Sequence, residues 1–345
     1  ATGQHDRLEN VYLRLRSSNG EVGFGEAAIA THITGETVAF TMQNLKRVAA
    51  KIVGYDISNP LVVGMEFRPY FKNNHAGLAA FEMAVLDVYA RSKQVPFWRL
   101  FTPQPLSNKP VLTTDITIVL GTVKEAAAAA SRYAGQGFKT FKVKVGKDEK
   151  LDLKRVLEIN RQAPDIDLIL DANQSFAAAG MLRFLKRLRS EGVCPSLVEQ
   201  PVPKTDWAGM KKVTRALRET STLVCADESV GSFAEAAYAI QTESASAINI
   251  KFMKSGILES AEIARVARAK GVPLMIGAMM ESSLSITAAA HFSVALGCFQ
   301  FVDLDTTYFI QGDLARSPYL DGRGRFDLTG AGPGLGVAVS PASRT

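Results

Sequence analysis

The chain has 345 residues, 47% of them hydrophobic and 21% charged, which is the composition of a globular protein and excludes a disordered one. The net charge of +6 is spread along the chain without a block of five like charges, and no apolar run approaches the roughly 18 residues of a membrane span, so neither nucleic acid nor membrane is an expected partner. The three cysteines are far apart and form no C-x-x-C pair, which argues against a disulfide framework and a zinc site and favours a cytoplasmic protein.

The first hundred residues predict a small α+β domain. The stretch "ENVYLRLRSSNGEVGFGEA" alternates apolar and polar residues on either side of Asn19-Gly20, which indicates a β-hairpin, and "AGLAAFEMAVLDVYARSKQ" has the period of a helix. The opening "ATGQHDRLEN" is not typical of a signal peptide, and its lack of an initiator Met leaves open whether residues precede Ala1.

From Val111 onward, short apolar strands alternate with longer helical patterns, an order that implies a parallel sheet. The strands we expect are eight, the number that closes a (β/α)₈ barrel: "LTTDITIV", "TFKVKV", "DLILD", "SLVEQ", "TLVCAD", "SAINIK", "PLMIGAMM" and "FQFVDLD".

Charged residues stand at or just past the C-terminal ends of seven of these strands. Their successive intervals are 27, 28, 28, 24, 30 and 22 residues, about one strand-helix unit each, for Lys144, Asp171, Glu199, Asp227, Lys251, Glu281 and Asp303. A single carboxylate at such a place is often the N-cap of the next helix, and a group of them can also form a structural ion-pair network. Seven in register favour an active site at the mouth of the barrel, because catalytic residues of such barrels come from that end.

The strand "TFKVKV" places Lys142 and Lys144 on one face and its apolar residues on the other. In a closed barrel we expect the apolar face to pack outward under the helices, and both lysines to point inward.

Asp171, Glu199 and Asp227 come from three consecutive strands with no His or Cys beside them. Carboxylate oxygens are the ligands that Mg²⁺ or Mn²⁺ prefers, so these three predict a metal site. Lys142 and Lys144 lie on the second strand and Lys251 on the sixth. A lysine acts as a base near neutrality only if its pKa falls from about 10.4 to about 7 or 8, and a neighbouring ammonium and a divalent cation both lower it.

The series K-V-K, "LDANQ", "VEQP", "ADES" and "NIK" resembles the enolase superfamily, in its muconate-lactonizing subgroup, over nearly the whole chain. The resemblance implies an α+β capping domain over residues 1–108, in which family members usually have one more strand before this point, and a modified (β/α)₈ barrel over 109–315. Residues 316–345, which contain "GPGLGV", are expected to return to the cap. Within the subgroup, "DLD" at 303–305 and "MMESSLS" are similar to the dipeptide epimerases.

This resemblance also implies roles. Mg²⁺ would hold the substrate carboxylate, while Lys144 and Lys251 on opposite faces of the α-carbon would exchange its proton through an enediolate intermediate. Lys142 would depress the pKa of Lys144 and contact the carboxylate. Asp303 and Asp305 would bind the ammonium of a dipeptide, with Glu281 and Ser282 beside the substrate, and the family's habit implies a homo-oligomer.

Side-chain specificity is expected to come partly from the cap, in the first loop and the loop around residues 27–32. Epimerases acting on Ala-Glu carry an arginine in the first loop, where this chain has His5. We therefore expect a dipeptide other than Ala-Glu, with a hydrophobic or cationic C-terminal residue.

Three alternatives remain open at this level. Muconate cycloisomerase, o-succinylbenzoate synthase or N-succinylamino acid racemase activity shares the same enolate step, although the first two substrates offer no ammonium for "DLD". A barrel that only binds ligand has no use for two neutral bases. A lysine Schiff-base aldolase does not need three metal-binding carboxylates.

Overall fold

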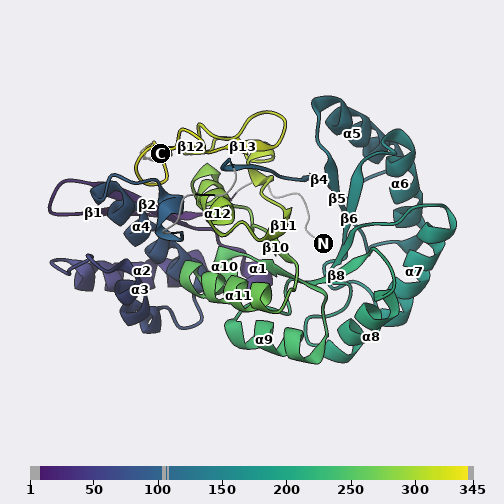
Figure 1. Cartoon of the computed structure of the whole chain (residues 1–345), viewed down its shortest axis with the longest axis horizontal. Helices are drawn as coiled ribbons and strands as arrows, with labels where there is room; N and C mark the ends of the chain where they lie inside the picture. Colours follow the sequence, from purple (N-terminus) through teal and green to yellow (C-terminus); the bar gives the residue numbers. More distant parts are fainter. Residues whose placement is uncertain (1–7, 103–105, 107–108, 341–345) are drawn as a thin grey trace.

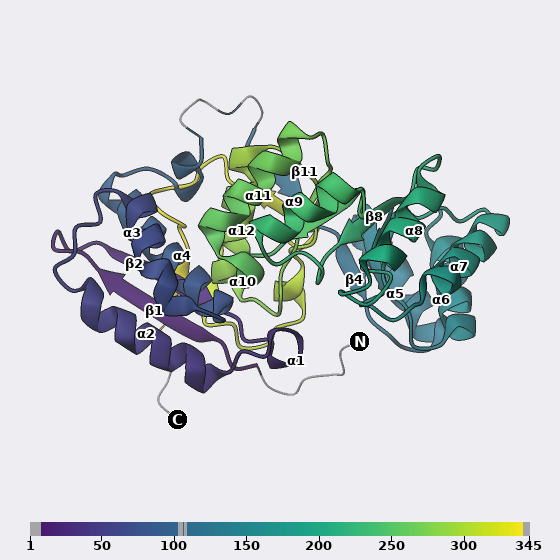
Figure 2. The same ribbon diagram turned by 90° about the horizontal axis from the view of Figure 1, so that it is seen from below.

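The computed structural model describes residues 8–102, 106 and 109–340. Figure 1 shows two parts, with the N-terminal elements grouped on the left and an arc of strands and helices on the right. Figure 2, turned by 90°, shows the same division along the long axis. The predicted fold class, a TIM-type barrel with an α+β cap, is confirmed.

The cap contains the predicted hairpin and the predicted long helix. Strands β1 (Val11–Arg16) and β2 (Val22–Ala27) pair antiparallel, with the turn at Gly20 in the left-handed region at φ 91°. The helical elements of the cap are α1 (Thr31–Thr34), α2 (Val38–Ile52), α3 (Pro60–Phe67), η1 (Arg68–Phe71), α4 (His75–Ser92) and η2 (Phe97–Leu100).

Helix α4 is almost entirely buried because it lies between the cap hairpin and the barrel. Its close approach to β2 requires glycine, since a Cβ built on Gly25 would lie 1.9 Å from the carbonyl oxygen of Ala80. The glycines of "EVGFGEA" thus set how closely this helix packs against β2.

Eight parallel strands form the barrel, in the order β11-β10-β9-β8-β7-β6-β5-β4. They are β4 (Ile116–Ile118), β5 (Thr140–Lys144), β6 (Asp167–Asp171), β7 (Leu197–Glu199), β8 (Leu223–Ala226), β9 (Ala247–Ile250), β10 (Leu274–Ile276) and β11 (Phe299–Val302). The two outer strands meet where Asp115 N, just before β4, donates to Val302 O at 2.9 Å.

The prediction of one continuous first strand over "LTTDITIV" is wrong. The chain breaks at Thr114 and Asp115, so that β3 (Val111–Thr113) pairs with β13 (Arg325–Asp327) and only β4 joins the barrel. The reason is that Thr114 and Asp115 bond to the end of the last strand: Thr114 Oγ1 accepts from Leu304 N at 2.7 Å.

Helices follow the strands around the barrel, and α5 to α8 cover the outside of the arc in Figure 1. They are α5 (Val123–Gln136), α6 (Glu149–Gln162), α7 (Ala178–Ser190), α8 (Trp207–Leu217), α9 (Phe233–Thr242), α10 (Phe252–Ser255), α11 (Ile257–Ala269) and α12 (Ser283–Leu296), with η3 (Thr306–Tyr308) after the last strand.

The barrel interior has an apolar layer below the expected site. One residue from each of six successive strands forms it: Ile169, Leu197, Cys225, Ala247, Met275 and Phe301. Because side chains alternate along a strand, the residue two places further on faces the same interior. On β6 and β7 that residue is Asp171 and Glu199, and on the segments that leave β8 and β11 it is Asp227 and Asp303. The inner apolar layer therefore supports a charged layer at the mouth.

The C-terminal segment, which includes β12 (Ala315–Arg316) and β14 (Ala338–Val339), contacts the cap. Gly334 O accepts from Phe97 N at 2.9 Å, and Leu335 N donates to Asp87 Oδ1 at 2.8 Å. These contacts fit a segment returning to the cap, while the boundaries at 108 and 315 stay a prediction. Among the described residues, no helix has the length and hydropathy needed to cross a membrane.

Glu82, in the middle of α4, holds the start of a barrel helix. Its Oε2 accepts from Ile257 N at 2.5 Å and from Leu258 N at 3.0 Å, the first residues of α11. Gly256 before that helix has no side chain to cap it, so the cap domain supplies the carboxylate. Burial raises the pKa of Glu82 to about 7, although the two N–H groups and Arg68 favour the ionised form.

We expect Glu82→Gln to make the free energy of unfolding less dependent on pH. The pKa of Glu82 is higher in the folded chain (about 7) than its ordinary 4.5, so the stability that it contributes is fully present below pH 4.5 and lost as the pH rises through 7. The gap between the two values corresponds to about 3 kcal/mol. Urea unfolding at pH 4.5 and at about pH 8 should therefore show the wild-type chain losing about that much relative to the variant. Glu66→Gln, on an exposed position of α3, is the matched control, and an equal pH dependence of wild type and Glu82→Gln would contradict the expectation.

Candidate active site

Lys142 is the most enclosed base in the mouth of the barrel. Its side chain is 3% exposed, and Nζ lies 2.6 Å from Asp303 Oδ2, 2.7 Å from Glu199 Oε2 and 3.1 Å from Asp171 Oδ2. The contact with Glu199 is an ion pair without the geometry of a hydrogen bond. Burial alone would lower the pKa of Lys142, but Asp171, Asp303 and Glu199 outweigh it and hold that pKa well above its ordinary value.

Lys144 lies on the same face of β5, as the alternation predicts, but nearer the solvent. Its Nζ donates to Asp171 Oδ2 at 2.6 Å and to Asn173 Oδ1 at 3.1 Å, and its side chain is 20% exposed. Burial alone would raise the pKa of Asp171, and the two lysines hold it well below its usual range instead. Phe141 and Val143 are buried on the opposite face.

Across the barrel, Asp227 binds two lysines. Lys251 Nζ lies 2.8 Å from its Oδ2, and Lys254 Nζ lies 2.8 Å from its Oδ1. Lys254 also donates to the carbonyl oxygens of Asp227 and Asn249. Burial alone would raise the pKa of Asp227, but the two ammonium groups hold it well below its usual range.

Burial alone would lower the pKa of Lys251, but Asp227 and Glu199 dominate and raise it above its ordinary value. The carboxylates that face the lysine are the reason, since an opposite charge nearby favours the charged ammonium. The lowering expected from a bound divalent cation stays a prediction.

Lys144 and Lys251 lie on opposite sides of the barrel. Lys144 ends β5 and Lys251 follows β9, four strands further in the order of the sheet. The side chains of the two strands therefore approach the mouth from opposite directions, as proton transfer on two faces of one carbon requires.

One asparagine and one glutamine that sequence analysis did not select lie in the loops after β6 and β7. Asn173, the partner of Lys144, and Gln200 follow Asp171 and Glu199 closely, and both have positive φ, at 40° and 34°. Gln200 Oε1 accepts from Asp227 N at 3.0 Å, which ties the loop after β7 to the loop after β8. Strained backbone of this kind is typical of functional sites, and the motifs "LDANQ" and "VEQP" contain the signal.

Gly277 makes room for the Lys251 side chain. A Cβ built on it would lie 2.7 Å from Asn249 Oδ1 and 2.9 Å from Lys251 Cε. Asn249, two residues before Lys251 and on the same face of β9, donates to Glu199 Oε1 at 2.7 Å. The absence of a side chain on Gly277, just after β10, therefore leaves space for Asn249 and Lys251 in the interior.

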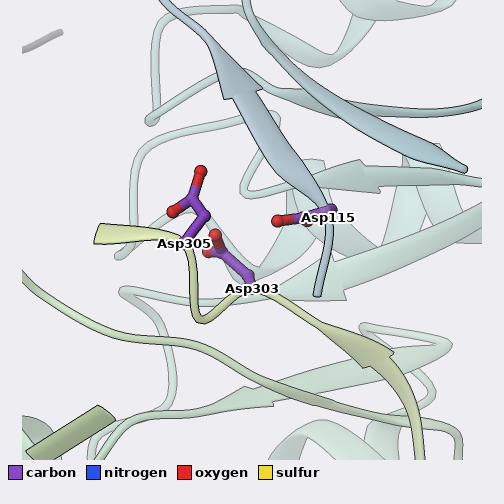
Figure 3. A group of neighbouring side chains, drawn as sticks. All are labelled: Asp115, Asp303 and Asp305. Atoms are coloured by element: carbon purple, nitrogen blue, oxygen red, sulfur yellow. The ribbon is translucent and has the colours of Figure 1, made fainter. Parts of the chain in front are cut away.

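The aspartates of "DLD" also lie in the mouth. Asp303 Oδ2 accepts from Lys142, and Asp305 Oδ2 accepts from Thr117 N at 2.6 Å. Burial, followed by the charge of Asp303, raises the pKa of Asp305 to about 6. Asp115 completes a group of three carboxyl groups whose ligand atoms lie within 4.8 Å of one another (Figure 3).

Glu281 and Ser282 lie in the loop between β10 and α12, with their polar atoms bound to protein groups. Glu281 Oε1 accepts from Met279 N at 2.8 Å, and Ser282 bonds through both its backbone and its hydroxyl to Glu26 of the cap. Burial raises the pKa of Glu281 to about 7. Substrate contact by either residue stays a prediction, and His5 lies outside the described residues.

Asp171, Glu199 and Asp227 suit a hard divalent cation. All three are buried oxygen donors, and Glu199 Oε2 and the neighbouring Glu228 Oε2 have no hydrogen-bond partner among the described residues. Asp171 and Glu199 are direct neighbours in the sheet, whereas Asp227 lies two residues beyond Cys225, the partner of Glu199. They are less tightly grouped than the three aspartates of Figure 3, because lysines lie between them.

The fold and the site define a class: a capped α/β-barrel enzyme with carboxylates on consecutive strands and lysines on opposite sides of them. Comparison with known protein families leads to the same class. Residues 1–102 match the mandelate racemase / muconate lactonizing enzyme N-terminal domain, and residues 124–343 match the enolase C-terminal domain-like family. The chain belongs to the mandelate racemase / muconate lactonizing enzyme family of the enolase superfamily.

Three proteins similar to this chain are epimerases that act on dipeptides. The hydrophobic dipeptide epimerase of Citrifermentans bemidjiense is 56% identical over 338 residues, which cover 98% of this chain and 92% of the relative. The substrate-liganded L-Ala-D/L-Glu epimerase of Bacillus subtilis has a TM-score of 0.90 at 34% identity, covering 96% of this chain and 91% of that one. The dipeptide epimerase of Enterococcus faecalis V583, complexed with Mg and L-Leu-L-Tyr, has a TM-score of 0.88 at 29% identity, covering 95% and 91%.

Proposed function

We propose that this protein is a Mg²⁺-dependent dipeptide epimerase that inverts the α-carbon of the C-terminal residue of a dipeptide. The observation that carries the proposal is the placement of Lys144 and Lys251 at the ends of strands four places apart around one barrel, with buried carboxylates between them. The dipeptide epimerases among the chain's relatives support the same reaction.

In this proposal, Asp171, Glu199 and Asp227 hold Mg²⁺. When bound, the metal supplies Lewis-acid stabilisation of the charge that develops on the substrate carboxylate. Its positive charge also lowers the pKa of a nearby lysine. Lys144 removes or returns the α-proton on one face, and Lys251 does so on the other. Lys142, which contacts two of the carboxylates, binds the substrate carboxylate with them.

The C-terminal side chain of the substrate is proposed to be hydrophobic. The loop at residues 27–32 reads "AAIATH" and includes no Arg, Lys, Asp or Glu. Ala28 N donates to Met253 Sδ at 3.4 Å, and Met253 lies two residues after Lys251, so this loop reaches the barrel close to one proposed base. An apolar loop at this place suits an apolar side chain and leaves a Glu side chain unpaired.

Deuterium exchange tests the proposal directly. We expect the chain, incubated with Mg²⁺ and a library of L,L-dipeptides in D₂O, to incorporate one deuteron at the α-carbon of the C-terminal residue, with Leu, Phe or Tyr there preferred over Glu and with exchange lost on chelation. Mass spectrometry measures the label, and chiral chromatography measures the L,D product. A preference for Ala-Glu would overturn the side-chain assignment. Absence of exchange with every dipeptide, from protein shown to bind Mg²⁺, would overturn the activity and favour the cycloisomerase and synthase substrates.

We also propose that the protein works in the cytoplasm as a homo-oligomer. All three cysteines lie within the described residues and are free thiols, which fits a reducing compartment. Helix α3 exposes a group of large apolar side chains, with Leu61 55% and Met65 70% exposed. A face of this kind suits association with a second copy of the chain.

A further inference from the structure

Asp115 is a buried carboxyl group that the proposed reaction leaves without a role. Asp115 is 2% exposed, and neither its Oδ1 nor its Oδ2 has a hydrogen-bond partner among the described residues. Figure 3 shows its side chain, just before β4, pointing toward Asp303 and Asp305, which follow β11. An ionised carboxylate buried in this way is costly unless a cation or a hydrogen-bond donor satisfies it.

The surroundings of Asp115 are negatively charged. Asp303 and Asp305 lie in the same group, Glu199 adds a further carboxyl group nearby, and the ammonium of Lys142 opposes their effect on Asp115. Burial, followed by the charges of Asp303 and Asp305, raises the pKa of Asp115 well above its ordinary value. The three carboxyl groups are therefore stable together only if a cation binds between them or if one of them retains a proton.

Asp303 and Asp305 each use one oxygen on a protein donor, Lys142 Nζ and Thr117 N respectively. Asp115 offers both of its oxygens without a partner, beside the carboxyl groups of Asp303 and Asp305. A primary ammonium has three N–H donors and no acceptor, which matches a site of three neighbouring carboxyl groups.

We propose that Asp115 is the third carboxylate of the ammonium subsite and makes the enzyme select a primary over a secondary N-terminal amine. The inference rests on the proposed dipeptide epimerase function and deepens it by adding a specificity residue to the site. A dipeptide with an N-methylated first residue, or with Pro in that position, has one N–H fewer and leaves one buried carboxylate unpaired. A site built for a hydrogen bond rejects the analogue that lacks it.

The test compares L-Ala-L-Leu with N-methyl-L-Ala-L-Leu in the wild-type chain, in Asp115→Asn and in the exposed control Asp165→Asn. We expect the wild type and the control to prefer the primary amine by about tenfold or more in kcat/KM. Asp115→Asn should raise KM for the primary amine by about tenfold, leave kcat within a few-fold, and lose most of the discrimination. Its melting temperature without substrate should equal or exceed that of the wild type, because the side chain of Asp115 has no hydrogen-bond partner to lose.

The possible results distinguish the role of Asp115 from the proposed epimerase function. A wild-type chain that epimerises dipeptides while Asp115→Asn keeps the same KM and discrimination overturns the role of Asp115 alone. Calorimetry that finds a second Mg²⁺ site in the wild type, lost in Asp115→Asn, overturns the ammonium assignment in favour of a metal. A wild-type chain that neither epimerises nor binds any dipeptide overturns the proposed function and this inference with it.

Discussion

Replacing either Lys144 or Lys251 with Gln is expected to reduce epimerisation by at least about 10³-fold while leaving hydrogen exchange at one epimer. Each lysine approaches the mouth from its own side, from β5 and from β9. A variant that keeps one lysine can still remove and return the α-proton that faces it, but it cannot deliver a proton to the other face. The two variants should therefore exchange opposite epimers.

The measurement follows deuterium uptake from D₂O into the L,L and the L,D dipeptide separately. Neither substitution removes every partner of its carboxylate, since Asp171 keeps Lys142 and Asp227 keeps Lys254. Both variants should therefore fold, and Lys147→Gln, at an exposed position just after β5, should behave as the wild type. Exchange of both epimers by both variants would show that neither lysine is an essential base, and loss of all exchange in each would show that they act together on one face.

The ends of the strands could be predicted from sequence because their signal is local and repeated. A charged residue after each apolar strand, at intervals of one strand-helix unit, is enough to place Asp171, Glu199 and Lys251 at one end of a barrel. The alternation of "TFKVKV" is likewise enough to turn both of its lysines inward, where the structure places them.

Residues that act from outside this pattern were missed for physical reasons. Lys254 binds Asp227 from the four-residue helix α10, one turn after the strand end that carries Lys251, so a search confined to strand ends passes over it. The spacing of Lys251 and Lys254, three residues apart at a helix start, is the signal that could have found it. Asp115 was hidden because "LTTDITIV" has the composition of one strand, whereas hydrogen bonds to the last strand break it in two.

Contacts between the cap and the barrel have no local signature at all. Glu26 lies on β2, yet it binds Ser282 and Ser285, more than 250 residues later in the chain, as well as Asn10. Burial raises the pKa of Glu26 even though these donors oppose it. Such a pair depends on how two domains pack, which neither periodicity nor propensity records.

Asp227→Asn is expected to remove both Mg²⁺ binding and about 3 kcal/mol of stability. The carboxylate neutralises two buried ammonium groups, Lys251 at 2.8 Å and Lys254 at 2.8 Å, whose side chains are 8% and 9% exposed. An amide carries no charge, and its NH₂ group would face one of the two ammonium groups. The variant therefore leaves uncompensated positive charge in the barrel.

Glu199→Gln provides the comparison that separates metal binding from folding. Loss of the Glu199 charge leaves Lys142 paired with Asp171 and Asp303, and the amide oxygen of the new Gln can still accept from Asn249. We expect both variants to lose Mg²⁺ affinity and at least about 10³-fold in activity, since each removes one of three proposed ligands. Only Asp227→Asn should also lower the urea midpoint strongly, whereas exposed Asp165→Asn should change neither property.

Calorimetric titration with Mg²⁺ and urea unfolding without metal measure the two effects independently. Chelation of the wild-type chain should abolish activity, and added Mg²⁺ or Mn²⁺ should restore it. Equal destabilisation by Asp227→Asn and Glu199→Gln would show that the lysines around Asp227 do not depend on its charge. Undiminished Mg²⁺ affinity in either variant would remove that residue from the metal site. Because the same carboxylates pair with lysines and are proposed to bind the metal, the protein's stability and its activity depend on one set of charges at the mouth of the barrel.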